Sequence, residues 1–316
     1  MSSIDSFSNL FPYINLKLRK CEQILSLIGL YFVCKFSSKL FYKLIKLSYY
    51  QIWAQIRANP LKGSKSWAVV TFVSNKFGVS FAEKLAENGF DLVLIDDNKQ
   101  LLDSISAQIS SKYQIQVKTI LVDFSDGLES YRLIERQIED KNIGLLLNNV
   151  SLINEFTNNY TNLSSKQIFM ILNKEMVSVL IMTSMVLPQM ISRRSGYIIN
   201  VSSILSVVPM PYLSLHSASK AFVDRFSTAL SYECQPKGIT VQSLMPSVCS
   251  DKSMVGLLAP SHTTYAKFAF NTIGLTNRTT GYFGHEFQFW LLERVPQILF
   301  PYLSSYFLNS FKFNFT

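Results

Sequence analysis

The chain has 316 residues, of which 48% are hydrophobic, and it carries a formal net charge of +9. This length suits one large domain or two modest ones, with ample apolar material for a core. The four cysteines and three histidines are scattered without metal-ligand spacing, which argues against a metal site and favours ordinary thiols in a reducing compartment.

The positive charge is concentrated at the N-terminus. Residues 1–62 contain nine Lys and Arg side chains against two acidic ones, so they hold +7 of the +9. The rest of the chain is close to neutral. This distribution argues against a nucleic-acid-binding face on the main domain, and no nucleic-acid partner is expected.

Residues 1–62 are predicted to form a helical segment that associates with a membrane. An apolar run from Ile24 to Cys34 is too short to cross a bilayer about 30 Å thick. Lysines then recur at intervals of four, four and three, which places them on one helical face: Lys35, Lys39, Lys43 and Lys46. A basic face beside apolar side chains suits the headgroup layer of a membrane. The alternative is a helix packed on its own domain or on a dimer partner.

Residues 63–283 alternate short apolar runs with amphipathic stretches. Six strands are predicted, at Trp67–Val73, Asp91–Ile95, Val117–Val122, Ile143–Val150, Gly196–Ser202 and Ile239–Met245. Five helices are predicted between them, at Val79–Asn88, Leu101–Ser111, Leu128–Glu139, Ser164–Met190 and Ser217–Glu233. This alternation predicts right-handed crossovers and a parallel sheet. We therefore expect a single α/β domain with a doubly wound, Rossmann-type parallel sheet.

Residues 284–316 form an aromatic C-terminal extension. The stretch from 282 to 316 contains twelve aromatic residues. The segments Phe300-Pro301-Tyr302 and Phe311-Lys312-Phe313-Asn314-Phe315 are typical of interfacial anchors, and with the basic helix they would make a two-point membrane attachment. The alternative is a set of core or dimer contacts.

Several short motifs follow one another in an informative order. A predicted strand ends at Thr71, Asp123-Phe124-Ser125 follows the third strand, and Asn148-Asn149-Val150 ends the fourth. Asn200-Val201-Ser202-Ser203 closes the fifth. Over roughly residues 65–290 this order resembles the short-chain dehydrogenase/reductase family. Within that family the chain is most similar to the steroid dehydrogenase and very-long-chain 3-oxoacyl-CoA reductase branch.

The catalytic signature of that family is present with one letter changed. Ser203 is followed thirteen residues later by His216-Ser217-Ala218-Ser219-Lys220, which resembles Ser…Tyr-x-x-x-Lys with His216 in place of the tyrosine. The resemblance implies a phenol that transfers a proton, a lysine that lowers its pKa and a serine that holds the substrate oxygen. Glu175 stands where the resemblance implies an asparagine. We expect Glu175 to pair with Lys220 or to lie displaced on its helix.

The phosphate-binding turn is also altered. Active relatives read Thr-Gly-x-x-x-Gly-x-Gly, whereas residues 71–78 read Thr-Phe-Val-Ser-Asn-Lys-Phe-Gly. Only Gly78 of the glycines remains, and we expect Phe72 and Lys76 to put side chains into the space that the cofactor phosphates need. The resemblance implies cofactor-binding positions at Thr71, Gly78, Asp97, Asp123, Asn149 and Lys220.

Other cofactor-facing positions depart from the family as well. Asp96 and Asp97 end the second strand, where two carboxylates disfavour a 2′-phosphate and leave NAD(H) open, unless they belong to a solvated loop. Ser151 replaces a glycine, and Asp251 stands near the place of a nicotinamide-binding threonine. We therefore expect no cofactor. The alternative is that the altered turn still accommodates NAD(H) or NADP(H).

Three interpretations of His216 stay open. It is a degenerate core residue, the acid of an altered reductase, or part of a Glu175–His216–Ser203 hydrolase arrangement. Imidazole is shorter than phenol, and a misplacement of about 1 Å can cost roughly a hundredfold in rate. The first interpretation is therefore preferred.

The leading hypothesis is a catalytically inactive short-chain dehydrogenase that acts as a membrane-associated binding or scaffold protein in lipid or steroid metabolism. The alternatives are an active NAD(P)-dependent 3-oxoacyl-CoA or 17β-hydroxysteroid oxidoreductase with an unusual proton donor, and a module that binds a lipid ligand in the former substrate cleft. The resemblance implies mitochondria, with the endoplasmic reticulum membrane as alternative. A homodimer through residues 164–190 and 217–233 is expected by analogy alone.

Overall fold

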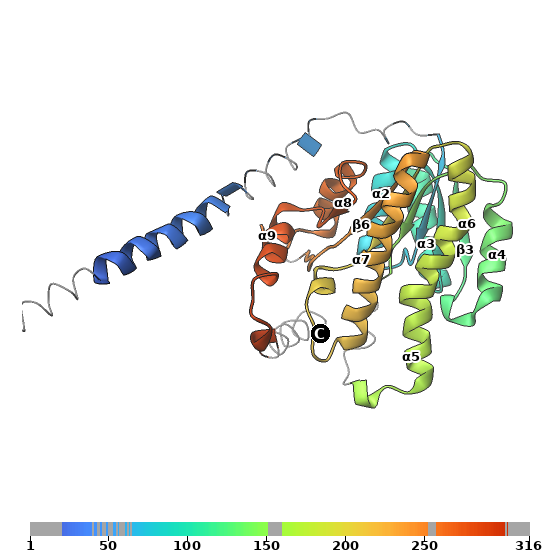
Figure 1. Ribbon diagram of the computed structural model, residues 1–316. Coiled ribbons are helices and arrows are strands. Elements are labelled where there is room, and N and C mark those ends of the chain that lie inside the picture. The colour runs from blue at the N-terminus through green and yellow to red at the C-terminus, as the bar shows by residue number, and fades with distance from the viewer. Residues whose placement is uncertain are drawn as a thin grey trace, which may run out of the picture. The chain divides into compact units, whose positions relative to one another are not determined.

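The computed structural model describes residues 21–39, 41–42, 45, 49, 53–54, 56, 61, 63, 65–150, 160–251, 257–300 and 302. The chain divides into two compact units, Met1–Ile52 and Trp53–Thr316. In the first unit residues 21–39 form a helix. The second unit contains the predicted α/β domain (Figure 1).

A seven-stranded parallel sheet forms the centre of the second unit. Its strands are β1 (Trp67–Thr71), β2 (Asp91–Asp96), β3 (Val117–Leu121), β4 (Ile143–Asn148), β5 (Gly196–Val201), β6 (Ile239–Leu244) and β7 (Arg278–Thr279). They are ordered β3-β2-β1-β4-β5-β6-β7, and every pairing is parallel. The order reverses between β1 and β4, and ligands of doubly wound sheets bind beyond the carboxyl ends of the strands at such a point.

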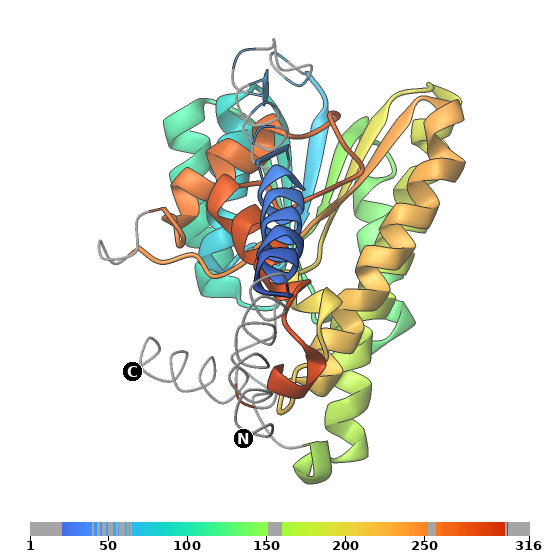
Figure 2. The same cartoon turned by 60° about the vertical axis from the view of Figure 1, so that its left-hand side comes forward.

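Helices cover both faces of the sheet (Figure 2). One layer consists of α2 (Lys76–Glu87), α3 (Lys99–Tyr113) and α8 (His262–Asn271), and the other of α4 (Leu128–Ile138), α6 (Ser178–Ser192) and α7 (Ser214–Cys234). The helix α5 (Ser165–Leu172) leads into α6 through a π turn, Asn173–Val177, and α9 (Phe283–Leu292) follows β7. Buried apolar side chains fill the space between each layer and the sheet, which accounts for the predominantly apolar strands.

The expected Rossmann-type fold is confirmed, and the six predicted strands recur within a few residues of their expected ends. The strand expected to reach Val73 ends at Thr71, because Phe72 adopts a left-handed backbone conformation with φ +51°. The single helix expected over Ser164–Met190 is interrupted by the π turn. The elements α8, β7 and α9 were not predicted.

Within the described residues, one helix is long and apolar enough to span a membrane, Ser165–Ser192, which contains an 18-residue stretch with a mean hydropathy of 1.5. Its residues Met182, Val186 and Met190 are fully buried in the core beside the sheet. Length and composition of this kind are shared by core helices of soluble proteins. We therefore assign this helix to the domain core.

Several predictions stay untested. The boundaries of the segments 1–62, 63–283 and 284–316 stay predictions. Lys43, Lys46, Ser151 and the aromatic tail beyond residue 302 lie outside the described residues.

Candidate functional site

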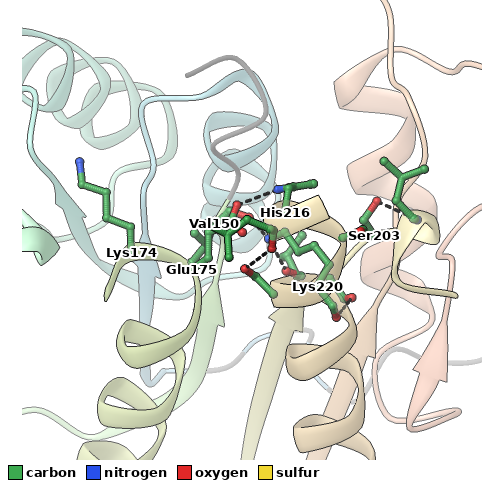
Figure 3. Close-up of polar contacts among 12 residues, drawn as sticks. Val150, Lys174, Glu175, Ser203, His216 and Lys220 are labelled. Atoms are coloured by element: carbon green, nitrogen blue, oxygen red, sulfur yellow. Dashed lines mark hydrogen bonds and ion pairs between the residues drawn. The ribbon is translucent and has the colours of Figure 1, made fainter. Parts of the chain in front are cut away.

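The residues of the altered signature lie at the carboxyl end of the sheet, where Figure 3 shows them. Ser203 follows β5, and His216 and Lys220 belong to the first turns of α7. Glu175 approaches from the π turn between α5 and α6. All four side chains are buried. A strand end and two helices therefore bring the four predicted catalytic positions to the same end of the domain.

His216 and Glu175 form a buried pair. The Nδ1 atom of His216 lies 2.8 Å from Oε1 of Glu175. Burial tends to raise the pKa of Glu175, but the charges of His216 and Lys220 outweigh it and hold that pKa below its ordinary value. Glu175 was expected to pair with Lys220, but its hydrogen-bond partner is His216, because the π turn directs the carboxylate to the first turn of α7. Lys220 acts on Glu175 through its charge alone.

Lys220 is held by the backbone. Its ammonium group donates hydrogen bonds to the carbonyl of Val150 and, at 3.3 Å, to the carbonyl of Val201. Complete burial lowers the pKa of Lys220, and the nearby charge of Glu175 partly offsets this. The donors of the ammonium group are therefore directed to protein carbonyls.

Ser203 bonds within its own turn. Its hydroxyl oxygen accepts a hydrogen bond of 3.2 Å from the amide of Leu205, and Figure 3 shows it turned away from His216. Of the arrangement Glu175–His216–Ser203 considered above, the described contacts contain only the link between Glu175 and His216. The hydrolase interpretation therefore has no support in the geometry.

The first strand-to-helix turn is closed by its own side chains. Asn149 donates from Nδ2 to the carbonyl of Phe72 at 2.8 Å and to Oδ1 of Asn75 at 3.2 Å. The hydroxyl of Thr71 accepts from the amide of Asn149 at 3.1 Å. A Cβ atom at Gly78 would lie 2.7 Å from Nδ2 of Asn149, so glycine is required there for close approach. The predicted positions 71, 78 and 149 are thus in mutual contact.

The expectation that Lys76 fills the phosphate space stays a prediction, because its side chain is exposed to solvent. Lys76 is the first residue of α2, and its side chain is 74% exposed and lies 2.9 Å from Asp251. Asp251 also lies 3.0 Å from Nδ1 of His262. Phe72, by contrast, packs inward against Phe124, with ring centroids 4.6 Å apart. Only Phe72 of the two bulky replacements is directed to the interior.

The carboxylates at the ends of β2 and β3 are already bonded to protein groups. Asp96 is buried, and its Oδ2 atom accepts from the amide of Ser74 at 2.8 Å. Asp97 and Asp123 lie 3.0 Å and 3.3 Å from the ammonium nitrogen of Lys174. Asp97 is therefore in an ion pair, and its side chain is 44% exposed in the solvated segment that follows β2.

Lys174 was not predicted as a site residue. It is the middle residue of the segment Asn173-Lys174-Glu175. The resemblance to the short-chain dehydrogenase family implies a valine at this position. The signal that could have identified it is a lysine within a predicted helix that has few other charged residues.

These residues do not fit a nicotinamide nucleotide as they stand. A doubly wound sheet uses a glycine-rich first turn for the pyrophosphate and an acidic side chain near the end of β2 for the ribose hydroxyls. Here Phe72 takes the place of a turn glycine, and Asp97 is bonded to Lys174. No reaction step through such a cofactor is derived for this chain.

The family is established by comparison with known proteins. The family model described as "short chain dehydrogenase" matches residues 66–259, which is more than half of the chain. The chain belongs to the short-chain dehydrogenase family. A solved short-chain dehydrogenase from Sphingobium yanoikuyae in complex with NADPH has the same fold, with a TM-score of 0.60 at 23% identity over 66% of this chain and 84% of that chain.

Comparison with individual relatives identifies the branch of the family to which the chain is similar. The chain is 35% identical to hydroxysteroid dehydrogenase-like protein 1 of Gallus gallus, over 97% of this chain and 96% of that protein. It is 34% identical to inactive hydroxysteroid dehydrogenase-like protein 1 of Homo sapiens, over 95% and 94% of the two chains. It is 36% identical to very-long-chain 3-oxoacyl-CoA reductase of Anas platyrhynchos, over 74% and 77%. The expected branch, steroid dehydrogenases and very-long-chain 3-oxoacyl-CoA reductases, is confirmed.

Proposed function

We propose that this protein is a catalytically inactive short-chain dehydrogenase that acts as a membrane-associated binding or scaffold protein in lipid or steroid metabolism. The observation that carries the proposal is the set of hydrogen bonds made by the residues of the altered catalytic signature. His216 is held by Glu175, Lys220 by two backbone carbonyls and Ser203 by its own turn. The residues that would have to act together on a substrate oxygen are bonded elsewhere.

The chemistry of ketone reduction supports the same conclusion. Reduction of a ketone needs an acidic group within hydrogen-bond distance of the oxygen that receives the proton. His216 is shorter than the tyrosine it replaces, and its Nδ1 atom is directed to Glu175. Several mammalian relatives that share nearly their whole length with this chain are themselves named inactive.

Turnover of the full-length protein tests this proposal. We expect no oxidation of NADH or NADPH above background with very-long-chain 3-oxoacyl-CoA or 17-oxosteroid substrates. The matched control is Lys220→Ala, which removes the lysine of the signature. Turnover that is present in the unaltered protein and lost in Lys220→Ala would contradict the proposal and favour the altered reductase.

Membrane association is the second part of the proposal. Considered by itself, the helix of residues 21–39 leaves apolar side chains exposed around its circumference, among them Leu25, Leu27, Tyr31, Phe32 and Phe36. Lys35 and Lys39 add positive charge near its end. Apolar and basic side chains on one exposed helix are the combination that binds anionic membrane surfaces. Mitochondrial location, with the endoplasmic reticulum as alternative, belongs to the same proposal.

Flotation with anionic vesicles tests the membrane part. We expect the full-length protein to float with phosphatidylserine-containing vesicles and the variant Leu25→Glu/Phe32→Glu to lose most of this binding. The control is Leu128→Glu, because Leu128 is similarly exposed (66%) but lies on α4 of the main domain. Equal flotation of the helix variant and the control would exclude the helix as the attachment site.

A further inference from the structure

We infer that Lys174 excludes nicotinamide nucleotides from this protein. Its ammonium group neutralises the carboxylates of Asp97 and Asp123, which lie where the adenosine part of such a nucleotide would bind. This inference deepens the proposed function and rests on it, but it concerns binding and makes no statement about turnover.

The position of Lys174 depends on the π turn. Asn173–Val177 interrupts the long helix between α5 and α6, and the hydroxyl of Ser178 donates to the carbonyl of Lys174 at 2.5 Å. Figure 3 shows the neighbouring side chains leaving in different directions, Glu175 to His216 and Lys174 away from that cluster. π turns widen a helix locally and are frequent at functional sites. The π turn therefore positions two side chains in different parts of the altered site, Glu175 beside His216 and Lys174 beside the two aspartates.

The ammonium group is buried between two carboxylates. The side chain of Lys174 is 8% exposed, and it joins Asp97 after β2 to Asp123 after β3. Burial tends to lower the pKa of Lys174, but its hydrogen bonds and charge interactions with both aspartates raise it above its ordinary value. For Asp123, burial tends to raise the pKa, and the amide of Ser125 together with Lys174 lowers it. The bridge therefore favours the charged forms of Lys174 and Asp123.

A nucleotide would compete with this bridge for Asp97. In doubly wound sheets the ribose hydroxyls bond to an acidic residue near the end of β2. Asp96 accepts from the backbone amides of Ser74, Asp97 and Asn98, and Asp97 is bonded to Lys174. A ribose that takes Asp97 leaves a buried cation with one partner fewer, which is costly. The bridge therefore opposes nucleotide binding directly.

Two aromatic rings lie beside the bridge. Phe72 stacks on Phe124 at 4.6 Å with an angle of 27° between the rings, and Phe124 directly follows Asp123. The carbonyl of Phe72 is fixed by Asn149. The rings pack in the apolar core, whereas Lys174 neutralises the carboxylates, so the two effects can be separated by substitution.

Calorimetric titration of the full-length protein with 5′-AMP and NADH tests the inference. AMP contains the adenosine end and a single phosphate, so damage at the nicotinamide end does not affect it, and adenosine is titrated in parallel to remove the contribution of the altered phosphate turn. We expect no saturable AMP binding by the unaltered protein up to about 1 mM, and binding at least roughly tenfold tighter by Lys174→Val. Lys174→Met, which keeps the length of the side chain, should gain less. The control is Lys112→Ala, which removes a surface ion pair with Glu83 and should gain nothing.

Thermal unfolding separates exclusion from a purely structural role. We expect Lys174→Val to unfold at a lower temperature than the unaltered protein and to be restabilised by AMP, because a ligand of the folded state raises its stability. A folded Lys174→Val or Lys174→Met variant without any gain in AMP binding overturns the inference. AMP binding by the unaltered protein as tight as that of the variants overturns it too, and leaves the proposed inactivity standing if turnover is absent.

Discussion

The pair of His216 and Glu175 leaves two polar atoms buried without a partner. Nε2 of His216 and Oε2 of Glu175 have no hydrogen-bond partner among the described residues. A buried unsatisfied polar group costs about 1–3 kcal/mol. The pair is kept in place because Glu175 also compensates the buried charge of Lys220. Glu175 is therefore the side chain on which the electrostatics of the altered signature depend.

Replacing Glu175 tests this dependence. Glu175→Gln removes the carboxylate from beside His216 and the buried Lys220, so we expect a loss of about 3 kcal/mol in the free energy of unfolding. Urea denaturation measures it, with Glu129→Gln as control, because the ion pair of Glu129 with Arg132 is exposed and should contribute little. A double-mutant cycle with His216→Gln should give a clear coupling energy. Additive effects of the two substitutions would show that the pair is energetically unimportant.

The same pair predicts a pH dependence. The folded-state pKa of Glu175 is depressed, so its stabilisation is present above the pKa of the unfolded chain and is lost as the pH falls through the folded value. In the acid range below about pH 4 the unaltered protein should therefore lose stability more steeply than Glu175→Gln. Parallel stability curves for the two proteins would contradict the assigned ionisation of Glu175.

At the residue scale, the sequence identified the altered positions but not their contacts. Replacement of a tyrosine by His216 and of an asparagine by Glu175 is visible by alignment with the family motif. The pairing of Glu175 with His216, and the direction of Lys174, depend on a π turn that helical periodicity does not reveal. The position of Lys76 in the first turn of α2 was not predicted, because this helix was expected to begin three residues later, at Val79.

At the scale of elements, the first strand-to-helix turn joins β1, α2 and the end of β4. Asn75 caps α2, and its side chain accepts from the amide of Gly78 at 2.7 Å. Asn149 links the same Asn75 to the carbonyl of Phe72. The turn thus keeps its shape through amide side chains rather than through a set of glycines.

Gly78→Ala tests the closeness of this contact. The new Cβ atom would lie 2.7 Å from Nδ2 of Asn149 and 2.8 Å from the backbone of Val73, so we expect a loss of about 1–3 kcal/mol from overpacking. Gly29→Ala is the matched control, because its Cβ atom would meet nothing within 4 Å in an exposed helix. Unchanged denaturation midpoints for both variants would show that the turn relaxes freely.

The strands were predictable and the C-terminal elements were not. Short apolar runs between turn residues define β1, β2 and β4 without ambiguity, since both faces of each strand are covered by helices. In contrast, β7 has only two residues, too few for a periodic pattern. Phe300 was expected in an interfacial anchor, but it is buried in an apolar cluster with Phe289, whereas Tyr302 is 74% exposed.

At the scale of the whole molecule, the short-chain dehydrogenase fold is retained, while most polar side chains of the altered site bond to other protein groups. The sheet and both helical layers are complete over the described part of the main unit. At the carboxyl ends of the strands, Lys174 bonds to the aspartates that follow β2 and β3, and Lys220 bonds to the last carbonyl of β5. The proposed scaffold role therefore needs no cofactor to complete the domain. A lipid ligand, a homodimer and the membrane of residence stay predictions.

The most direct test of the central claim is deuterium transfer over long incubation. The full-length protein is mixed with cofactor deuterated at the transferable position and a 17-oxosteroid or 3-oxoacyl-CoA, and the recovered alcohol is analysed by mass spectrometry. We expect no deuterated alcohol beyond that formed by the Lys220→Ala variant. Deuterium in the product that depends on Lys220 would show that hydride transfer persists, and would contradict the account of this protein as an inactive member of its family.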